Sequence, residues 1–130
     1  MIRKTKYIYI TFLILFFSKA DAQTSALAVA DSLYALGNYT SSINAYAKVG
    51  GKKSNLQIAR AYNTIGNYDK AIAQYRAVLD NNPEFDLARF ELGKLLLKTK
   101  NNGPALEMFQ FLTSSKQGNP EYFYYLGRTY

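Results

Sequence analysis

The chain has 130 residues, a length typical of one domain, with 48% hydrophobic residues and a formal net charge of +7. It contains no Cys, no His and no Trp. The commonest zinc ligands, the usual nucleophile–base pairs and structural disulfides are therefore excluded, so the composition argues against an enzyme and we expect no metal and no cofactor.

The segment 1–22 has the pattern of an export signal. Positive charges within residues 1–6 precede an apolar run over residues 7–17, and Ala20 and Ala22 form the small-residue pattern that signal peptidase accepts. We therefore expect cleavage before Gln23 and an exported protein of the bacterial periplasm or cell envelope. The alternative is an uncleaved membrane anchor, although the run is shorter than the roughly 20 apolar residues of a transmembrane helix. Without Cys, attachment as a lipoprotein is not expected.

Removal of this signal changes the charge of the chain. It would take away four of the 16 basic residues and one of the nine acidic ones, which leaves a net charge of +4. The remaining charges are dispersed, with no run of like sign. A mild, dispersed positive charge on an exported protein argues against a nucleic acid partner.

The rest of the chain predicts helices separated by short turns that are rich in Gly, Asn and Pro. The expected helices cover residues 24–36, about 40–49, 54–65, about 69–81, about 84–98, about 104–114, and the residues from 120 onward. Ser54 is expected to cap the third of them. No stretch alternates between polar and apolar residues with a period of two, so the predicted fold class is all-α.

The strongest pattern is an internal repeat. The stretch IGNYDKAIAQY at residues 65–75 resembles LGNYTSSINAY at residues 36–46, and later columns recur at a constant period of 34 positions. These columns are Ile58, Leu92 and Leu126; Ala59, Gly93 and Gly127; Tyr62, Leu96 and Tyr130; and Ala71 with Ala105. The segment from Phe123 to Tyr130 fits the pattern W-x2-L-G-x2-Y with Phe for Trp, and Ala71-x3-Tyr75 followed by Pro83 fits A-x3-F…P.

In these motifs the chain resembles the tetratricopeptide repeat family over about residues 23–130. The resemblance implies an α-solenoid of antiparallel helix pairs, wound as a right-handed superhelix of about three and a half repeats. The repeats would cover 23–51, 52–85, 86–119 and, in part, 120–130. The first pair departs from the pattern because it is five residues shorter and has Ser42 where the others have Ala71 and Ala105.

The last expected helix has no second helix to pair with. It would expose the apolar residues Tyr122, Phe123, Tyr125 and Leu126. Since the outer repeats of a solenoid need a polar cap, we expect further C-terminal repeats or another chain to cover residues 120–130.

The resemblance also implies a protein-binding or peptide-binding role, because in this family the first helix of each pair lines the concave surface. Two columns on that helix recur at the repeat period, an apolar one and a basic one, with flanking contacts beside them. The predicted partner-binding residues are Leu56, Phe90 and Tyr124; Arg60, Lys94 and Arg128; and, flanking them, Tyr34, Asn63 and Leu97.

These columns predict a partner segment, extended or helical, that carries apolar and acidic residues. The alternative is that the basic side chains are simply solvated and that Leu56 and Phe90 pack inside the solenoid. The carboxylate clamp of some family members is not expected, since the corresponding positions hold Leu27, Asp31, Leu87 and Glu91.

The predicted function is therefore a non-catalytic interaction scaffold of the cell envelope, with no catalytic residue and no small-molecule substrate. The alternative is the N-terminal recognition or sensor region of a longer enzyme or signalling protein, with its catalytic part beyond Tyr130. The carboxylates Asp80, Glu84 and Asp86 surround a turn, where helix capping and the helix dipole explain them.

Overall fold

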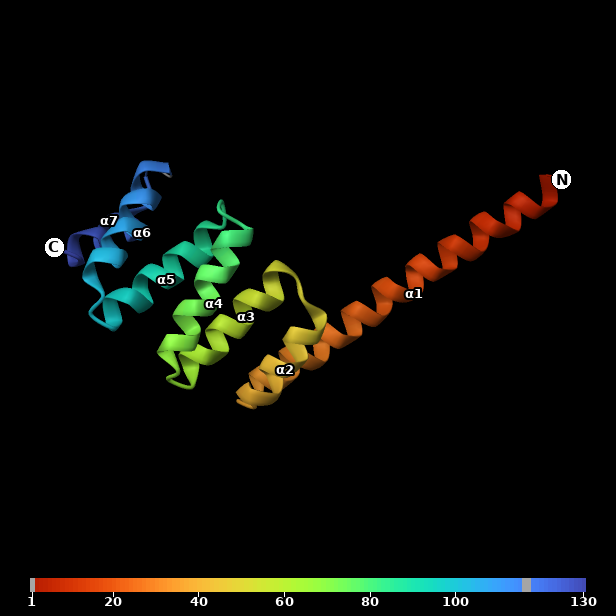
Figure 1. Cartoon of the computed structure of the whole chain (residues 1–130), viewed down its shortest axis with the longest axis horizontal. Coiled ribbons are helices and arrows are strands. Elements are labelled where there is room, and N and C mark those ends of the chain that lie inside the picture. The colour runs from red at the N-terminus through yellow and green to blue at the C-terminus, as the bar shows by residue number, and fades with distance from the viewer. Residues whose placement is uncertain (1, 116–117) are drawn as a thin grey trace.

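The computed structural model describes residues 2–115 and 118–130, and over these ranges the chain forms seven α-helices and no strand (Figure 1). The helices are α1 (Ile2–Ala35), α2 (Tyr39–Val49), α3 (Gly51–Thr64), α4 (Tyr68–Asn81), α5 (Asp86–Lys98), α6 (Asn102–Ser115) and α7 (Pro120–Arg128). Each helix packs against the next one along the chain. This nearest-neighbour arrangement is that of an α-solenoid, so the predicted fold class is confirmed.

The helix bounds agree with the predicted ones to within about three residues except at α1, and the largest other difference is at the start of α3. This helix begins at Gly51, so Ser54 lies inside it and is 2% exposed, and its predicted role as a cap is wrong. The reason lies in Gly50 and Gly51, which have φ angles of 70° and 85°. Because glycine adopts this left-handed conformation without steric cost, two residues suffice to reverse the chain.

Helix α1 is longer than predicted, because the expected export signal continues into the first repeat without a break. In Figure 1 its N-terminal half projects away from the other helices, and the side chains of residues 4–14 are exposed. Only the C-terminal part packs on the solenoid, where Ala30 is fully buried. The segment Lys4–Ala35 is long and apolar enough to cross a membrane, a test that export signals near an N-terminus also satisfy.

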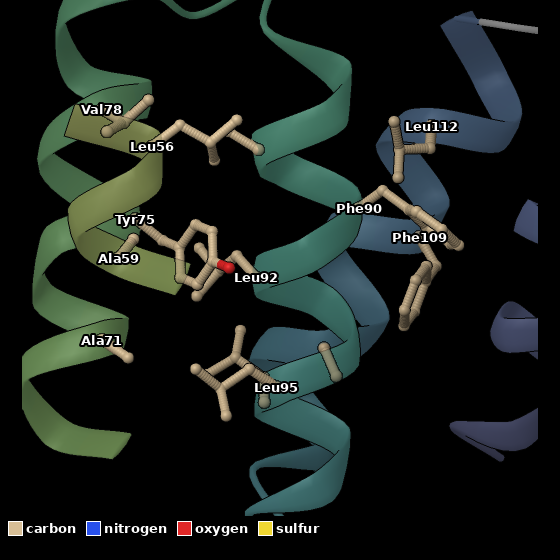
Figure 2. Packing of buried hydrophobic residues seen from close by; sticks show 13 residues of the cluster. Leu56, Ala59, Ala71, Tyr75, Val78, Phe90, Leu92, Leu95, Phe109 and Leu112 are labelled. Carbon is tan, nitrogen blue, oxygen red and sulfur yellow. The ribbon is translucent and has the colours of Figure 1, made fainter. Parts of the chain in front are cut away.

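The buried columns follow the predicted repeat. The main core joins α3 to α6 (Figure 2) and consists of Leu56, Ala59, Ala71, Tyr75, Val78, Ala88, Phe90, Leu92, Leu95, Leu96, Ala105, Phe109 and Leu112. A second cluster of Ala30, Tyr46 and Ile58 joins α1, α2 and α3. Gly93 lies against the ring of Phe109 so closely that a Cβ atom would come within 2.8 Å of a ring carbon.

Helix α7 ends at Arg128 instead of continuing to the last residue, and it is less exposed than predicted. Tyr122, Tyr125 and Leu126 are partly buried against the core. The ring of Phe90 lies 5.1 Å from that of Tyr122 and 5.4 Å from that of Tyr125. Of the four residues expected on the open face, only Phe123 is exposed, at 49%.

Candidate functional site

Two adjoining cavities lie along the first helices of the pairs. The smaller, of about 330 Å³, is lined by Tyr34, Arg60, Asn63, Thr64, Tyr75, Glu91, Lys94, Leu95 and Lys98. The larger, of about 650 Å³, is lined by Leu27, Asp31, Tyr34, Tyr46, Lys52, Lys53, Leu56, Gln57, Arg60, Phe85 and Leu87. Since Tyr34 and Arg60 line both, the two cavities adjoin at these residues, and we call the pair of cavities the groove. Helices α1, α3 and α5 supply most of its lining.

The groove contains some of the predicted binding residues and omits others. Tyr34, Leu56, Arg60, Asn63 and Lys94 line it, whereas Phe90, Leu97, Tyr124 and Arg128 do not.

The expected apolar column is mostly internal. Leu56 is 4% exposed and Phe90 is 7% exposed, and both belong to the main core. Leu97 is partly buried against the same core, while Tyr124 on α7 is 60% exposed. Leu56 and Phe90 therefore pack inside the solenoid, as the alternative interpretation of this column stated. Only a small part of Leu56 is left to form the groove wall.

Arg60 is held by an internal ion pair. Its Nε donates to the two carboxylate oxygens of Glu91 on α5, at 3.1 and 2.9 Å, and its Nη2 contacts the same group. Its Nη1 donates to Oε1 of Gln57 at 2.9 Å. The hydrogen bonds to Glu91 raise the pKa of Arg60 above its ordinary value. The Arg60 cation is thus neutralised within the solenoid and offers little charge to a partner.

Glu91 also belongs to a column of contacts between repeats that the sequence reasoning missed. In this column, one residue on each of the first helices α3, α5 and α7 contacts an aromatic residue on the helix before it, α2, α4 or α6. The pairs are Gln57 with Tyr46, Glu91 with Tyr75, and Tyr125 with Phe109. The Tyr75 hydroxyl donates to Glu91 Oε2 at 2.9 Å. The rings of Phe109 and Tyr125 stack at 5.6 Å. The period of this column was visible in the sequence, but its polar members resembled solvated surface residues.

Burial accompanies the polar contacts of this column. The Tyr46 hydroxyl donates to Asp31 at 2.6 Å, and burial, followed by that hydrogen bond, raises the pKa of Tyr46 to about 12. Burial and the charge of Glu91 raise the pKa of Tyr75 as well. Both phenols therefore stay neutral and donate hydrogen bonds over the physiological pH range.

The remaining cations of the smaller cavity are two lysines that lie beside aromatic rings. Lys94 Nζ lies 4.5 Å from the ring centroid of Phe90, and Lys98 Nζ lies 4.8 Å from that of Tyr68. Within residues 2–115 and 118–130, neither lysine belongs to an ion pair. A cation above a ring keeps its other side free for an anion, so these two lysines are the available positive charges of the smaller cavity.

The larger cavity combines apolar walls with a basic edge. Leu27, Phe85 and Leu87 supply apolar surface, and Leu87 is 45% exposed. Lys52 Nζ lies 4.6 Å from the ring centroid of Phe85, with Lys53 beside it in the chain. Lys52, Lys53, Phe85 and Leu87 were not predicted as contacts. No repeat column predicts them, because an acid and an apolar residue take the places of Lys52 and Lys53 in the next repeat.

Arg128, the last member of the predicted basic column, lies away from the groove. Its guanidinium is 5.9 Å from the ring centroid of Tyr124 and 5.8 Å from that of Tyr125. It belongs to α7, whereas the groove is built on α1, α3 and α5. The three members of the predicted basic column thus differ: Arg60 is paired with Glu91, Lys94 lies unpaired in the groove, and Arg128 lies outside it.

Comparisons with known proteins agree with this architecture. The family model described as tetratricopeptide repeat matches residues 56–120. Residues 41 to the end of MamA from Desulfovibrio magneticus RS-1 superpose with a TM-score of 0.76 at 18% identity, covering 83% of this chain and 64% of that one. This chain thus spans less than two thirds of the MamA chain. Comparison with curated protein sequences gives no match.

Several of the similar structures contain a bound segment of another protein. The type III secretion chaperone SycD of Yersinia enterocolitica, in complex with a peptide of the translocator YopD, has a TM-score of 0.69 at 17% identity, covering 84% of this chain and 87% of that one. The first TPR of Spaghetti (RPAP3), bound to the HSP90 peptide SRMEEVD, has a TM-score of 0.72 at 14% identity, covering 82% and 89%. At these identities the likeness concerns the fold.

The ion pair between Arg60 and Glu91 leads to a prediction about stability. Glu91→Gln removes the carboxylate that accepts hydrogen bonds from Arg60 and Tyr75. We expect it to lower the free energy of unfolding by about 1–3 kcal/mol. Urea unfolding of the full chain in mild detergent, followed by far-ultraviolet circular dichroism, measures the change.

The matched control is Glu107→Gln, at an exposed position of α6. Surface substitutions of this kind change stability by less than about 0.5 kcal/mol. Equal effects of the two substitutions would show that Glu91 does not hold α3 against α5.

Proposed function

Because the chain belongs to the tetratricopeptide repeat family, we propose that it is a non-catalytic interaction module whose groove binds a segment of a partner protein. The observation that carries the proposal is the pair of adjoining cavities, lined by the first helices of three successive pairs. The SycD and Spaghetti structures support this mode of action, since each holds a peptide of another protein.

The chemistry of the groove favours a partner segment with both acidic and apolar side chains. In the smaller cavity Lys94 and Lys98 are available to pair with a carboxylate, whereas Arg60 is already paired with Glu91. In the larger cavity apolar walls lie beside Lys52 and Lys53. Because a long-range field of one sign attracts the opposite charge, these lysines select an acidic segment, and the apolar walls provide contact area.

The cations that we propose for partner binding differ from those of the predicted basic column. Lys94 remains, Lys98 replaces Arg60, and Arg128 lies outside the groove. The two cavities share a wall at Tyr34 and Arg60, so an extended segment that crosses this wall would place an acidic side chain on α5 and an apolar one between α1 and α3.

Selection from a random peptide library tests this chemistry. The immobilised full chain should enrich sequences in which Asp or Glu lies within a few residues of apolar side chains. The double variant Lys94→Glu and Lys98→Glu should lose the acidic preference, because two of the groove's cations become anions. Sequencing of the starting library and of the peptides that remain bound after selection measures the enrichment.

The matched control is the double variant Lys48→Glu and Arg76→Glu, which makes the same change in charge at exposed positions of the second helices α2 and α4. It should select the same peptides as the unaltered chain. If both double variants lose the preference equally, the net charge of the chain selects the partner and the groove does not.

We also propose that the protein is exported and acts in the bacterial periplasm or cell envelope. The charged start, apolar run and Ala20-x-Ala22 pattern of the sequence support this proposal. The apolar side chains within residues 7–14 support it too, because they are exposed and do not belong to the buried core of the solenoid. Cleavage before Gln23 would leave the packed part of α1 in place.

N-terminal sequencing after expression in a bacterium tests the export proposal. We expect a soluble product that begins at Gln23. An Ala22→Arg variant should keep the signal, because signal peptidase requires a small residue at that position. A product that begins at Met1 and sediments with membranes in both cases would instead identify α1 as a permanent anchor.

A further inference from the structure

Gln23, the first residue of the chain that the proposed cleavage would release, is exposed on helix α1. Together with Ala20, Lys52 and Lys53 it lines a cavity of about 560 Å³ between α1 and the turn that joins α2 to α3. This cavity lies where α1 leaves the other helices (Figure 1). The proposed mature chain would therefore begin beside two lysines.

Cleavage before Gln23 would turn a point inside a helix into the start of a helix. In the uncleaved chain α1 continues through this point without a break. The Thr24 hydroxyl donates to the carbonyl oxygen of Ala20 at 2.9 Å, and cleavage takes that acceptor away. The first turn of the remaining helix also loses the carbonyl groups that its backbone N–H groups face, and it gains a new α-amine.

A protonated α-amine is unfavourable at this position. The N-terminus of a helix is the positive end of its dipole, which disfavours a cation there. Lys52 and Lys53 add two positive charges at the same cavity, and within residues 2–115 and 118–130 neither of them belongs to an ion pair. Like charges favour the neutral form of an amine, and the neutral amine is the form that acts as a nucleophile.

The side chain of a glutamine at the start of a chain can react with its own α-amine. The amine nitrogen attacks the side-chain amide carbon Cδ, and the new N–Cδ bond closes a five-membered lactam. The Cδ–Nε2 bond breaks, and the leaving nitrogen takes one hydrogen from the amine and departs as ammonia. Because both reacting groups belong to one residue, the reaction is intramolecular and needs no co-reactant.

We propose that Gln23 is a modification site and that the mature chain begins with the uncharged lactam pyroglutamate; this proposal rests on the proposed cleavage before Gln23. The lactam removes the cation from the positive end of the helix and from the neighbourhood of Lys52 and Lys53. Leu27, one turn further along α1, lines both this cavity and the larger cavity of the groove. The modification therefore stabilises a helical turn that supplies part of the groove wall.

Mass spectrometry of the exported protein tests the modification. The full chain is expressed in a bacterium, and the cells are lysed in an amine-reactive label that blocks any free α-amine before it can cyclise in the sample. Trypsin then cleaves only at arginine and releases residues 23–60 as the N-terminal peptide. We expect this peptide to carry no label on its α-nitrogen and to be lighter by one ammonia, with the loss located at residue 23 by fragmentation.

The matched control is Gln23→Asn, which keeps the side-chain amide but is one methylene group shorter. Its amine could close only a strained four-membered ring, so we expect a labelled α-amine and no loss of ammonia from residue 23. For the unaltered chain, a product that begins at Gln23 with a labelled α-amine would overturn the lactam and leave the export proposal standing. A product that begins at Met1 would overturn both.

Amide hydrogen exchange of the two mature chains tests the effect of the charge. In Gln23→Asn a protonated amine returns to the first turn, so the amides of residues 26–30 should exchange about two- to fivefold faster than in the unaltered chain. Adding Lys52→Gln and Lys53→Gln to both chains should reduce this difference, because these lysines repel only a charged terminus. Equal exchange in the unaltered and Gln23→Asn chains would overturn the proposed stabilisation of the groove wall.

Discussion

The structure depends on one contact, repeated along the chain, between a small residue on a first helix and an aromatic ring on the second helix that covers it. At Gly93 the ring of Phe109 leaves no room for a Cβ atom. In the preceding pair Ala59 and Tyr75 belong to the same buried core (Figure 2). Because each contact fixes how closely two helices approach, its repetition sets the spacing of the whole solenoid, and each pair requires its neighbour.

The same aromatic residues also join one repeat to the next, and these contacts determine which charges of the groove stay unpaired. Tyr75 donates to Glu91, and Glu91 accepts hydrogen bonds from Arg60. Charges that look available on an isolated helix are therefore neutralised once the helices stack. Lys94 and Lys98 lie above aromatic rings and have no acidic partner within the described ranges, so they keep their charge available in the groove.

The sequence predicted the fold well and the site less well. The repeat period identified the buried columns, because buried residue types change little from one repeat to the next. It did not distinguish the partners of surface residues. Arg60 and Lys94 occupy equivalent positions, yet one pairs with Glu91 and the other faces Tyr125, since the contact depends on the residue that the next repeat supplies. The cavity residues Lys52 and Phe85 lie near turns, where the repeat is irregular and no period marks them.

If a first helix is stable because a second helix covers it, the helices must differ in how fast their backbone amides exchange hydrogen with solvent. Amide hydrogen exchange of the full chain tests this most directly. Helix α5, which α4 and α6 both contact, should exchange slowly. Helix α7 packs on α6 and has an open face at Gly127, so its amides should exchange markedly faster. Exchange in α7 that is as slow as in α5 would contradict this dependence of first helices on their cover.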